Sequence, residues 1–210
     1  LADYLPPAEK AGTSHRPDAF NKSKNFREAE SWDIQQYLEM SPAERQKIAR
    51  ILKQRVYGKK GSGYSGESSG VIHSDYFSPD TVQLFSLLDK NRVKYLVVGG
   101  EAVIYYGFAR LTGDVDIFYD ISRKNVQKLY LSLKEFWGGK IPGLNSENEL
   151  SEPGAICQFG VPPNRIDLLN TITGVEFEDA WKNRTTEQIK YKSRSLEIYY
   201  IGLEELIQNK

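Results

Sequence analysis

The sequence contains a single cysteine and only two histidines among its 210 residues. Cys157 cannot form a disulfide bond within the chain, and together with His15 and His73 it offers too few thiolate and imidazole groups for a typical zinc site. Any metal ion that the chain binds is therefore expected to be held by oxygen atoms.

Long apolar runs are also missing. No run approaches the roughly 18 residues that a membrane-spanning helix needs, and the N-terminal stretch has neither the basic start nor the apolar core of a secretory signal. The hydrophobic content of 40% and the charged content of 27% are typical of soluble globular proteins. We expect a cytoplasmic protein with no membrane partner.

Composition divides the chain into three parts. Residues 1–60 are polar and contain a helical pattern, residues 61–70 are rich in glycine and serine, and residues 71–210 alternate strand and helix patterns. A tract such as 61–70 is typical of a flexible linker, whether natural or engineered. We therefore expect a helical segment, a linker and one compact domain.

Two helices are predicted in the first part. Residues 1–27 show little periodicity, whereas 28–40 and 41–57 carry helical patterns, and the second begins with a capping box of Ser41 and Glu44. A pair of this kind has one apolar side and cannot form a core alone, so it must pack against a partner or the rest of the chain. We expect a short helical hairpin.

The third part predicts an α+β fold with a small mixed β-sheet and helices packed on one face. Two predicted hairpins and several short helices contribute to it. The expected helices are 78–90, 101–107, 123–137 and 202–210, and the expected strands are 94–98, 114–120, 155–159, 165–169, 188–192 and 196–201.

Three acidic residues stand in apolar strand patterns. Asp114 and Asp116 lie two positions apart, so their carboxylates project from the same face of one strand, and Asp167 interrupts a second apolar strand. Neighbouring carboxylates repel each other unless a cation lies between them, and Mg²⁺ or Mn²⁺ accepts such oxygen ligands. Taken alone, a D-x-D pair is more typical of a solvated strand edge, but three carboxylates on adjacent strands opposite a glycine phosphate site fit two-metal phosphoryl transfer.

A double glycine precedes this acidic strand. The predicted strand 94–98 runs into Gly99 and Gly100 and then into a helix, where backbone N–H groups can approach a phosphate closely. The pair predicts a phosphate site, with a plain turn as the alternative.

The combination of Gly99-Gly100, Asp114-x-Asp116 and Asp167 resembles the signature of the nucleotidyltransferase superfamily, which is DNA polymerase beta-like. The segments GGEAVIYYGFARLTGDVDIF, RIDLLNTITGVEFEDAW and IGLEELI further resemble bacterial nucleotidyltransferase-like toxins of toxin-antitoxin pairs. The resemblance covers about residues 77–210. Its motifs are specific in combination and weak separately.

The resemblance implies transfer of a nucleoside monophosphate from an NTP such as ATP to an RNA acceptor such as tRNA, or to a protein acceptor. It implies that Asp114, Asp116 and Asp167 hold the metal and that Gly99-Gly100 binds the triphosphate. We add Arg110 and Thr112 as candidate phosphate contacts, with an ordinary surface role as the alternative.

The sequence departs from these relatives at two points, and its N-terminal part has a resemblance of its own. Many active relatives have serine where Gly100 stands, and relatives usually continue beyond the last helix, so part of the nucleotide or acceptor site is expected to be missing after Lys210. Residues 26–58 resemble the short helical antitoxins encoded beside such enzymes. Residues 1–60 are therefore expected to act as an antitoxin-like partner in cis, or else to complete the core.

A function of another class fits the same fold. A non-catalytic module that kept the nucleotidyltransferase fold and binds RNA or a protein is the alternative to an enzyme.

Overall fold

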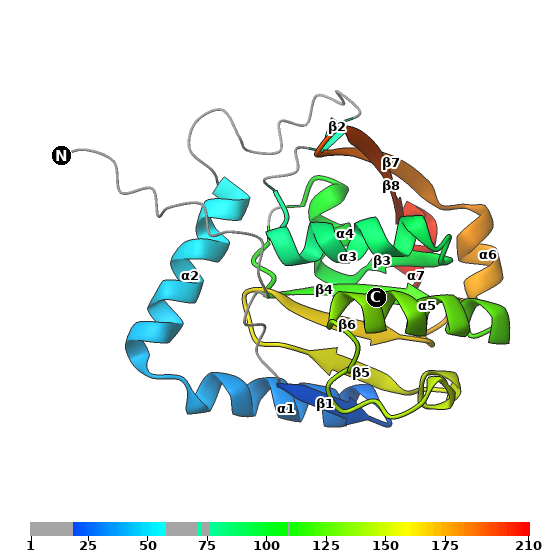
Figure 1. Ribbon diagram of the computed structural model, residues 1–210. Coiled ribbons are helices and arrows are strands. Elements are labelled where there is room, and N and C mark those ends of the chain that lie inside the picture. The colour runs from blue at the N-terminus through cyan, green and yellow to red at the C-terminus, as the bar shows by residue number, and fades with distance from the viewer. Residues whose placement is uncertain (1–18, 58–70, 73–75, 109) are drawn as a thin grey trace.

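The computed structural model describes residues 19–57, 71–72, 76–108 and 110–210. These residues form one mixed sheet of eight strands in the order β1-β5-β6-β4-β3-β8-β7-β2 (Figure 1). The strands are β1 (Phe20–Ser23), β2 (Val71–Ile72), β3 (Tyr95–Val98), β4 (Asp114–Tyr119), β5 (Ile156–Phe159), β6 (Arg165–Leu169), β7 (Thr185–Tyr191) and β8 (Arg194–Tyr200). The sheet is larger than the small sheet predicted, because β1 and β2 extend it at both edges.

The α+β class is confirmed, and both predicted hairpins form. β5 pairs antiparallel with β6, and β7 pairs antiparallel with β8. The helices are α1 (Phe26–Glu39), α2 (Pro42–Tyr57), α3 (Pro79–Lys90), α4 (Gly99–Tyr105), α5 (Arg123–Phe136), α6 (Phe177–Lys182) and α7 (Leu203–Gln208), and a 3-10 turn, η1, spans Glu147–Ser151. Within these described elements, none is long and apolar enough to cross a membrane.

The alternation along β4 separates the two faces of the sheet. Val115 and Ile117 are buried on one face, while Asp114 and Asp116 point to the other. α3 packs on the apolar face, where the ring of Phe85 stacks on Tyr95 of β3. This face holds most of the core because α3 and α5 both contribute apolar side chains to it.

Helices also lie on the acidic face, so the prediction of helices on one face only is wrong. α6 packs there through Phe177, whose ring contacts Phe118 of β4 at 5.1 Å between centroids. α1 lies against the other end of this face and contacts β1 and β5. The reason is that β5 and β6 carry further buried side chains on the acidic face, and α1 covers them.

β1 is a strand that the sequence did not predict. Its four residues pair antiparallel with β5, and the ring of Phe20 packs against Phe159 at 5.0 Å between centroids. The short sequence FNKS shows no alternation of apolar and polar residues, so no local pattern predicts a strand. The strand depends instead on its pairing with β5.

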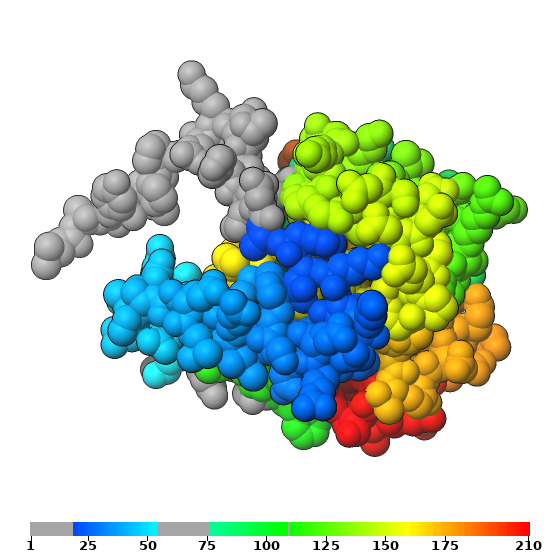
Figure 2. Space-filling view, turned by 90° about the horizontal axis from the view of Figure 1, so that it is seen from below, coloured from blue at the N-terminus to red at the C-terminus, as the bar shows by residue number. Residues whose placement is uncertain are grey.

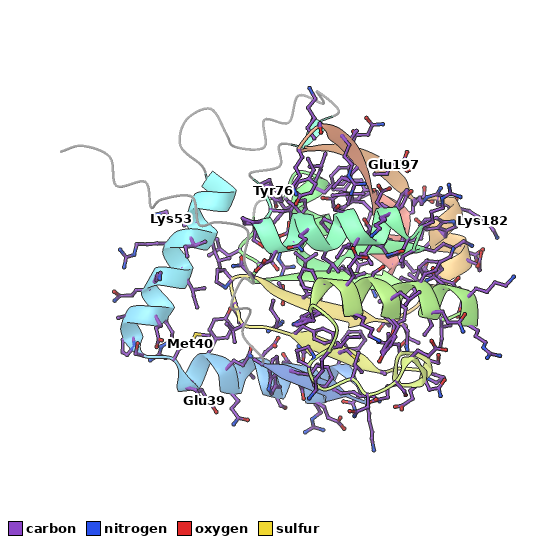
Figure 3. The ribbon with its side chains drawn as sticks, in the orientation of Figure 1. Glu39, Met40, Lys53, Tyr76, Lys182 and Glu197 are labelled. Atoms are coloured by element: carbon purple, nitrogen blue, oxygen red, sulfur yellow. The ribbon has the colours of Figure 1, made fainter. Side chains whose placement is uncertain are left out.

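α1 and α2 do not fold back on each other as a close hairpin. Figure 1 shows α2 rising at a steep angle from the end of α1, and Figure 3 shows Lys53 of α2 pointing away from the sheet. The predicted capping box at the start of α2 is confirmed, since the backbone N–H of Glu44 donates to the Ser41 hydroxyl at 3.3 Å and Ser41 N–H donates to the Glu44 carboxylate at 2.8 Å. The predicted linker, residues 61–70, lies outside the described residues.

Candidate metal centre

Parallel pairing of β4 with β6 brings the three predicted carboxylates together. Asp116 is paired with Asp167 in the register of these strands, and partners in a parallel pair share a face. One carboxylate oxygen from each of Asp114, Asp116 and Asp167 lies within 4.8 Å of the others. Residues more than 50 positions apart thus form one acidic cluster.

The double glycine lies directly against this cluster. Gly99 has a φ of +61°, and a β-carbon there would overlap the Asp116 carboxylate, while a β-carbon on Gly100 would overlap the Thr112 hydroxyl. The Gly100 N–H acts to lower the pKa of Asp116. The double glycine therefore lies in contact with the acidic cluster.

Thr112 and Arg110 have different environments. The Thr112 hydroxyl donates to the Asp114 carboxylate at 2.6 Å, which fixes the orientation of a cluster residue. Arg110 is exposed, and neither a hydrogen bond nor an ion pair joins it to another described residue. The structure thus brings Thr112 into the site and leaves Arg110 outside it.

Arg165 is a central member of the site that the sequence did not single out. It lies two residues before Asp167 on β6 and is paired with Asp114 of β4, so its side chain projects among the carboxylates. Its Nε donates to Asp167 at 2.7 Å, and its Nη2 donates to Asp114 and, at 3.0 Å, to Asp167. The R-x-D alternation could have indicated that Arg165 and Asp167 share a face.

A fourth carboxylate reaches the cluster from the N-terminal part of the chain. Asp33 of α1 forms an ion pair with Arg165, in which Nη2 donates to Asp33 Oδ2 at 3.0 Å. Gln158 of β5 donates to both Asp33 and Asp167, at 3.1 and 3.0 Å. Nothing in the sequence of α1 distinguished Asp33 from a solvated helix residue.

The cluster faces a cavity of about 350 Å³ between α1 and the sheet. Phe26, Ala29, Glu30 and Asp33 of α1 form one wall. The opposite wall carries the acidic cluster and Arg165. Figure 2 views the molecule from the side of α1, which lies in blue across this region.

The charges in the cavity are unbalanced. Four buried or partly buried carboxylates, those of Asp33, Asp114, Asp116 and Asp167, surround the single guanidinium of Arg165. Burial, together with the charges of Asp114 and Asp167, raises the pKa of Asp116 well above its usual value, although Arg165 and the Gly100 N–H oppose the shift. Burial likewise raises the pKa of Asp167 to about 6 despite the neighbouring Arg165.

This residue set fits a divalent cation. Carboxylate oxygens are the ligands that Mg²⁺ and Mn²⁺ prefer, and three carboxylates here place one oxygen each within 4.8 Å of one another. The guanidinium of Arg165 pairs with two of these carboxylates in the structure. The cation and Arg165 would therefore interact with the same carboxylates.

No protein-family model matches the chain, and no match was found among the curated proteins or the solved structures.

Proposed function

We propose that the chain is a metal-dependent nucleotidyltransferase that transfers a nucleoside monophosphate from an NTP to an RNA or protein acceptor. The observation that carries the proposal is the convergence of Asp114, Asp116 and Asp167, with oxygens within 4.8 Å of one another, beside Gly99-Gly100. The fold itself is consistent with this class only at the level of α+β, so the site is the main support.

The residues have distinct roles in this proposal. Asp114, Asp116 and Asp167 would hold Mg²⁺ or Mn²⁺, which supplies charge neutralisation of the phosphates when bound. Thr112 orients Asp114 through its hydrogen bond. The absence of side chains at Gly99-Gly100 lets the Asp116 carboxylate and the Thr112 side chain lie against the backbone after β3. Asp167 is the most buried carboxylate of the three and is the candidate to accept the proton of an acceptor hydroxyl.

The N-terminal part has the role of an antitoxin-like inhibitor in the proposal. α1 forms a wall of the cavity, and Asp33 binds the guanidinium that lies among the metal carboxylates. A chain of this design would be held inactive by its own first helix, and the remaining domain would act as the toxin.

The experiment is transfer of label from each of the four NTPs with Mg²⁺, using purified chain with total RNA or with a protein extract as acceptor. The full chain is compared with a chain that lacks residues 1–60. Asp116→Ala is expected to abolish transfer, and Asp179→Ala, an exposed acid on α6 that pairs with Lys182, is expected to retain it. Absence of both transfer and Mg-NTP binding in either form of the chain would contradict the enzyme.

A second function is favoured by one observation. Arg165 pairs with two of the three candidate metal carboxylates, Asp114 and Asp167, as expected for a non-catalytic module that kept the fold and binds RNA or a protein. In that case RNA or protein binding would persist in Asp116→Ala, and no NTP would be consumed.

A further inference from the structure

Arg165 occupies the position of a cation at the centre of the acidic cluster. Its side chain is 2% exposed and is the largest of the fully buried side chains in the described part of the chain. A buried guanidinium of this kind is stable only when its donors are paired with acceptors. Its partners here are the carboxylates of Asp167, Asp114 and Asp33.

Arg165 uses the same oxygens that a metal would require. One oxygen of Asp114 accepts from Thr112 and the other accepts from Arg165. Both oxygens of Asp167 accept from Arg165, and one of them also accepts from Gln158. A divalent ion bound to these two carboxylates therefore has to replace Arg165 at most of these contacts.

The same guanidinium fastens α1 to the sheet. Asp33 uses both of its oxygens, since Nη1 of Arg165 contacts Oδ1 and Nη2 donates to Oδ2. One turn earlier Ala29 is buried, and almost one turn later Gln36 donates to the carbonyl of Gly160 at 3.3 Å. Among these three α1 residues, Asp33 alone makes a charged contact. Loss of the Arg165 contact therefore removes the strongest polar attachment of α1 to the sheet.

Resting on the proposed function, we propose that Arg165 and Asp33 form a latch in which α1 and a divalent cation compete for the acidic cluster. In the latched state Arg165 binds Asp114 and Asp167 and holds α1 in place through Asp33. When a divalent cation binds these carboxylates, Arg165 withdraws and α1 loses its charged attachment. The cavity wall formed by α1 is thereby opened when the cation binds.

The first test measures Mn²⁺ binding to the full chain by isothermal titration calorimetry, without NTP. Arg165→Met removes the resident positive charge and is expected to bind Mn²⁺ at least about tenfold more tightly than the unmodified chain, because a competing cation in contact with the ligands is gone. Arg123→Met is the control, since Arg123 is an exposed residue at the start of α5. Equal or weaker Mn²⁺ binding in Arg165→Met would overturn the latch.

The second test follows α1 by hydrogen exchange and does not depend on Arg165→Met folding. Amides of residues 26–39 are expected to exchange faster in the unmodified chain when Mn²⁺ is saturating. Asp33→Asn is expected to show comparably fast exchange without Mn²⁺, and Asp179→Asn is expected to change nothing. Unchanged exchange of α1 upon Mn²⁺ saturation would refute the competition.

The two proposals can fail separately. Suppose that label transfer depends on Asp116 but Arg165→Met does not tighten Mn²⁺ binding. This result would support the enzyme function and contradict the latch. Absence of transfer together with absence of Mn²⁺ binding in every variant would remove both.

Discussion

The carboxylate of Asp116 lies in the space that a β-carbon on Gly99 would need. Gly99 also has a left-handed backbone conformation with a φ of +61°. Its lack of a side chain therefore serves two purposes, the backbone turn after β3 and the approach of the acidic strand.

Gly99→Ala is expected to lower the free energy of unfolding by about 2 to 5 kcal/mol, because the left-handed conformation and the overlap with Asp116 each contribute. Gly138→Ala is the matched control, since Gly138 has a φ of +67° and open space around it. This control is expected to cost only about 1 kcal/mol. Equal losses in urea unfolding of the two variants would show that the overlap is relieved without cost.

The pH dependence of stability should report the crowded carboxylates. A carboxyl group with a raised pKa binds its proton more tightly in the folded chain, so its contribution favours folding at low pH and is lost as the pH rises through the folded pKa. The pKa of Asp167 is about 6, and that of Asp116 is also raised.

In EDTA the chain is therefore expected to be about 1 to 3 kcal/mol more stable at pH 5 than at pH 7.5. Asp167→Asn should make this dependence shallower, and Mn²⁺ should stabilise the unmodified chain most at the higher pH. Thermal and urea unfolding across this range would reveal the trend, and stability that rises with pH in EDTA would contradict it.

Thr112 supports the site through a single hydrogen bond to Asp114. Thr112→Val keeps the shape of the side chain but removes the donor, and we expect Mn²⁺ affinity to fall by about tenfold, as is typical when a group that orients a metal ligand is lost. Thr112→Ser retains the hydroxyl and should bind nearly as well as the unmodified chain. Calorimetric titration of both variants separates the hydroxyl from the methyl group, and equal losses would assign the effect to packing.

Phe20 is the apolar anchor of β1. Its ring packs on Phe159 and against the backbone at Gly143, where a β-carbon would collide with the ring. Phe20→Ala is expected to cost about 2 kcal/mol and to increase hydrogen exchange in residues 20–23, because the ring is partly buried. Phe108→Ala removes a ring that is 68% exposed and should stay within about 0.5 kcal/mol of the unmodified chain. A Phe20→Ala variant with unchanged exchange in β1 would show that backbone pairing alone holds the strand.

The acidic cluster could be anticipated because strand alternation is a local signal. Asp114 and Asp116 share a face by their spacing alone, and Asp167 shares it through parallel pairing that the sequence suggested only by its apolar neighbours. The structure confirms that the three residues converge. Whether they bind a metal stays a prediction.

The residues that were missed depend on contacts between distant segments. Asp33 gains its role from Arg165, which lies 132 positions away, and no local pattern distinguishes it from other acids of α1. Ser122 stands at the start of α5, yet its hydroxyl donates to Asp120 at 2.6 Å and does not cap the helix. A short polar side chain can donate to several nearby acceptors, and the folded geometry decides which acceptor lies within hydrogen-bond distance.

Both edges of the sheet are formed by strands from the first 72 residues of the chain. Asn21 of β1 donates to Gln158, which lies 137 positions later, and β2 pairs with β7 near the end of the chain. On the ribosome, where the chain emerges from its N-terminus, β1 and β2 have no partner until most of the other strands have been synthesised. α1 can therefore settle over the acidic cluster only late in synthesis, after β4, β5 and β6 have emerged.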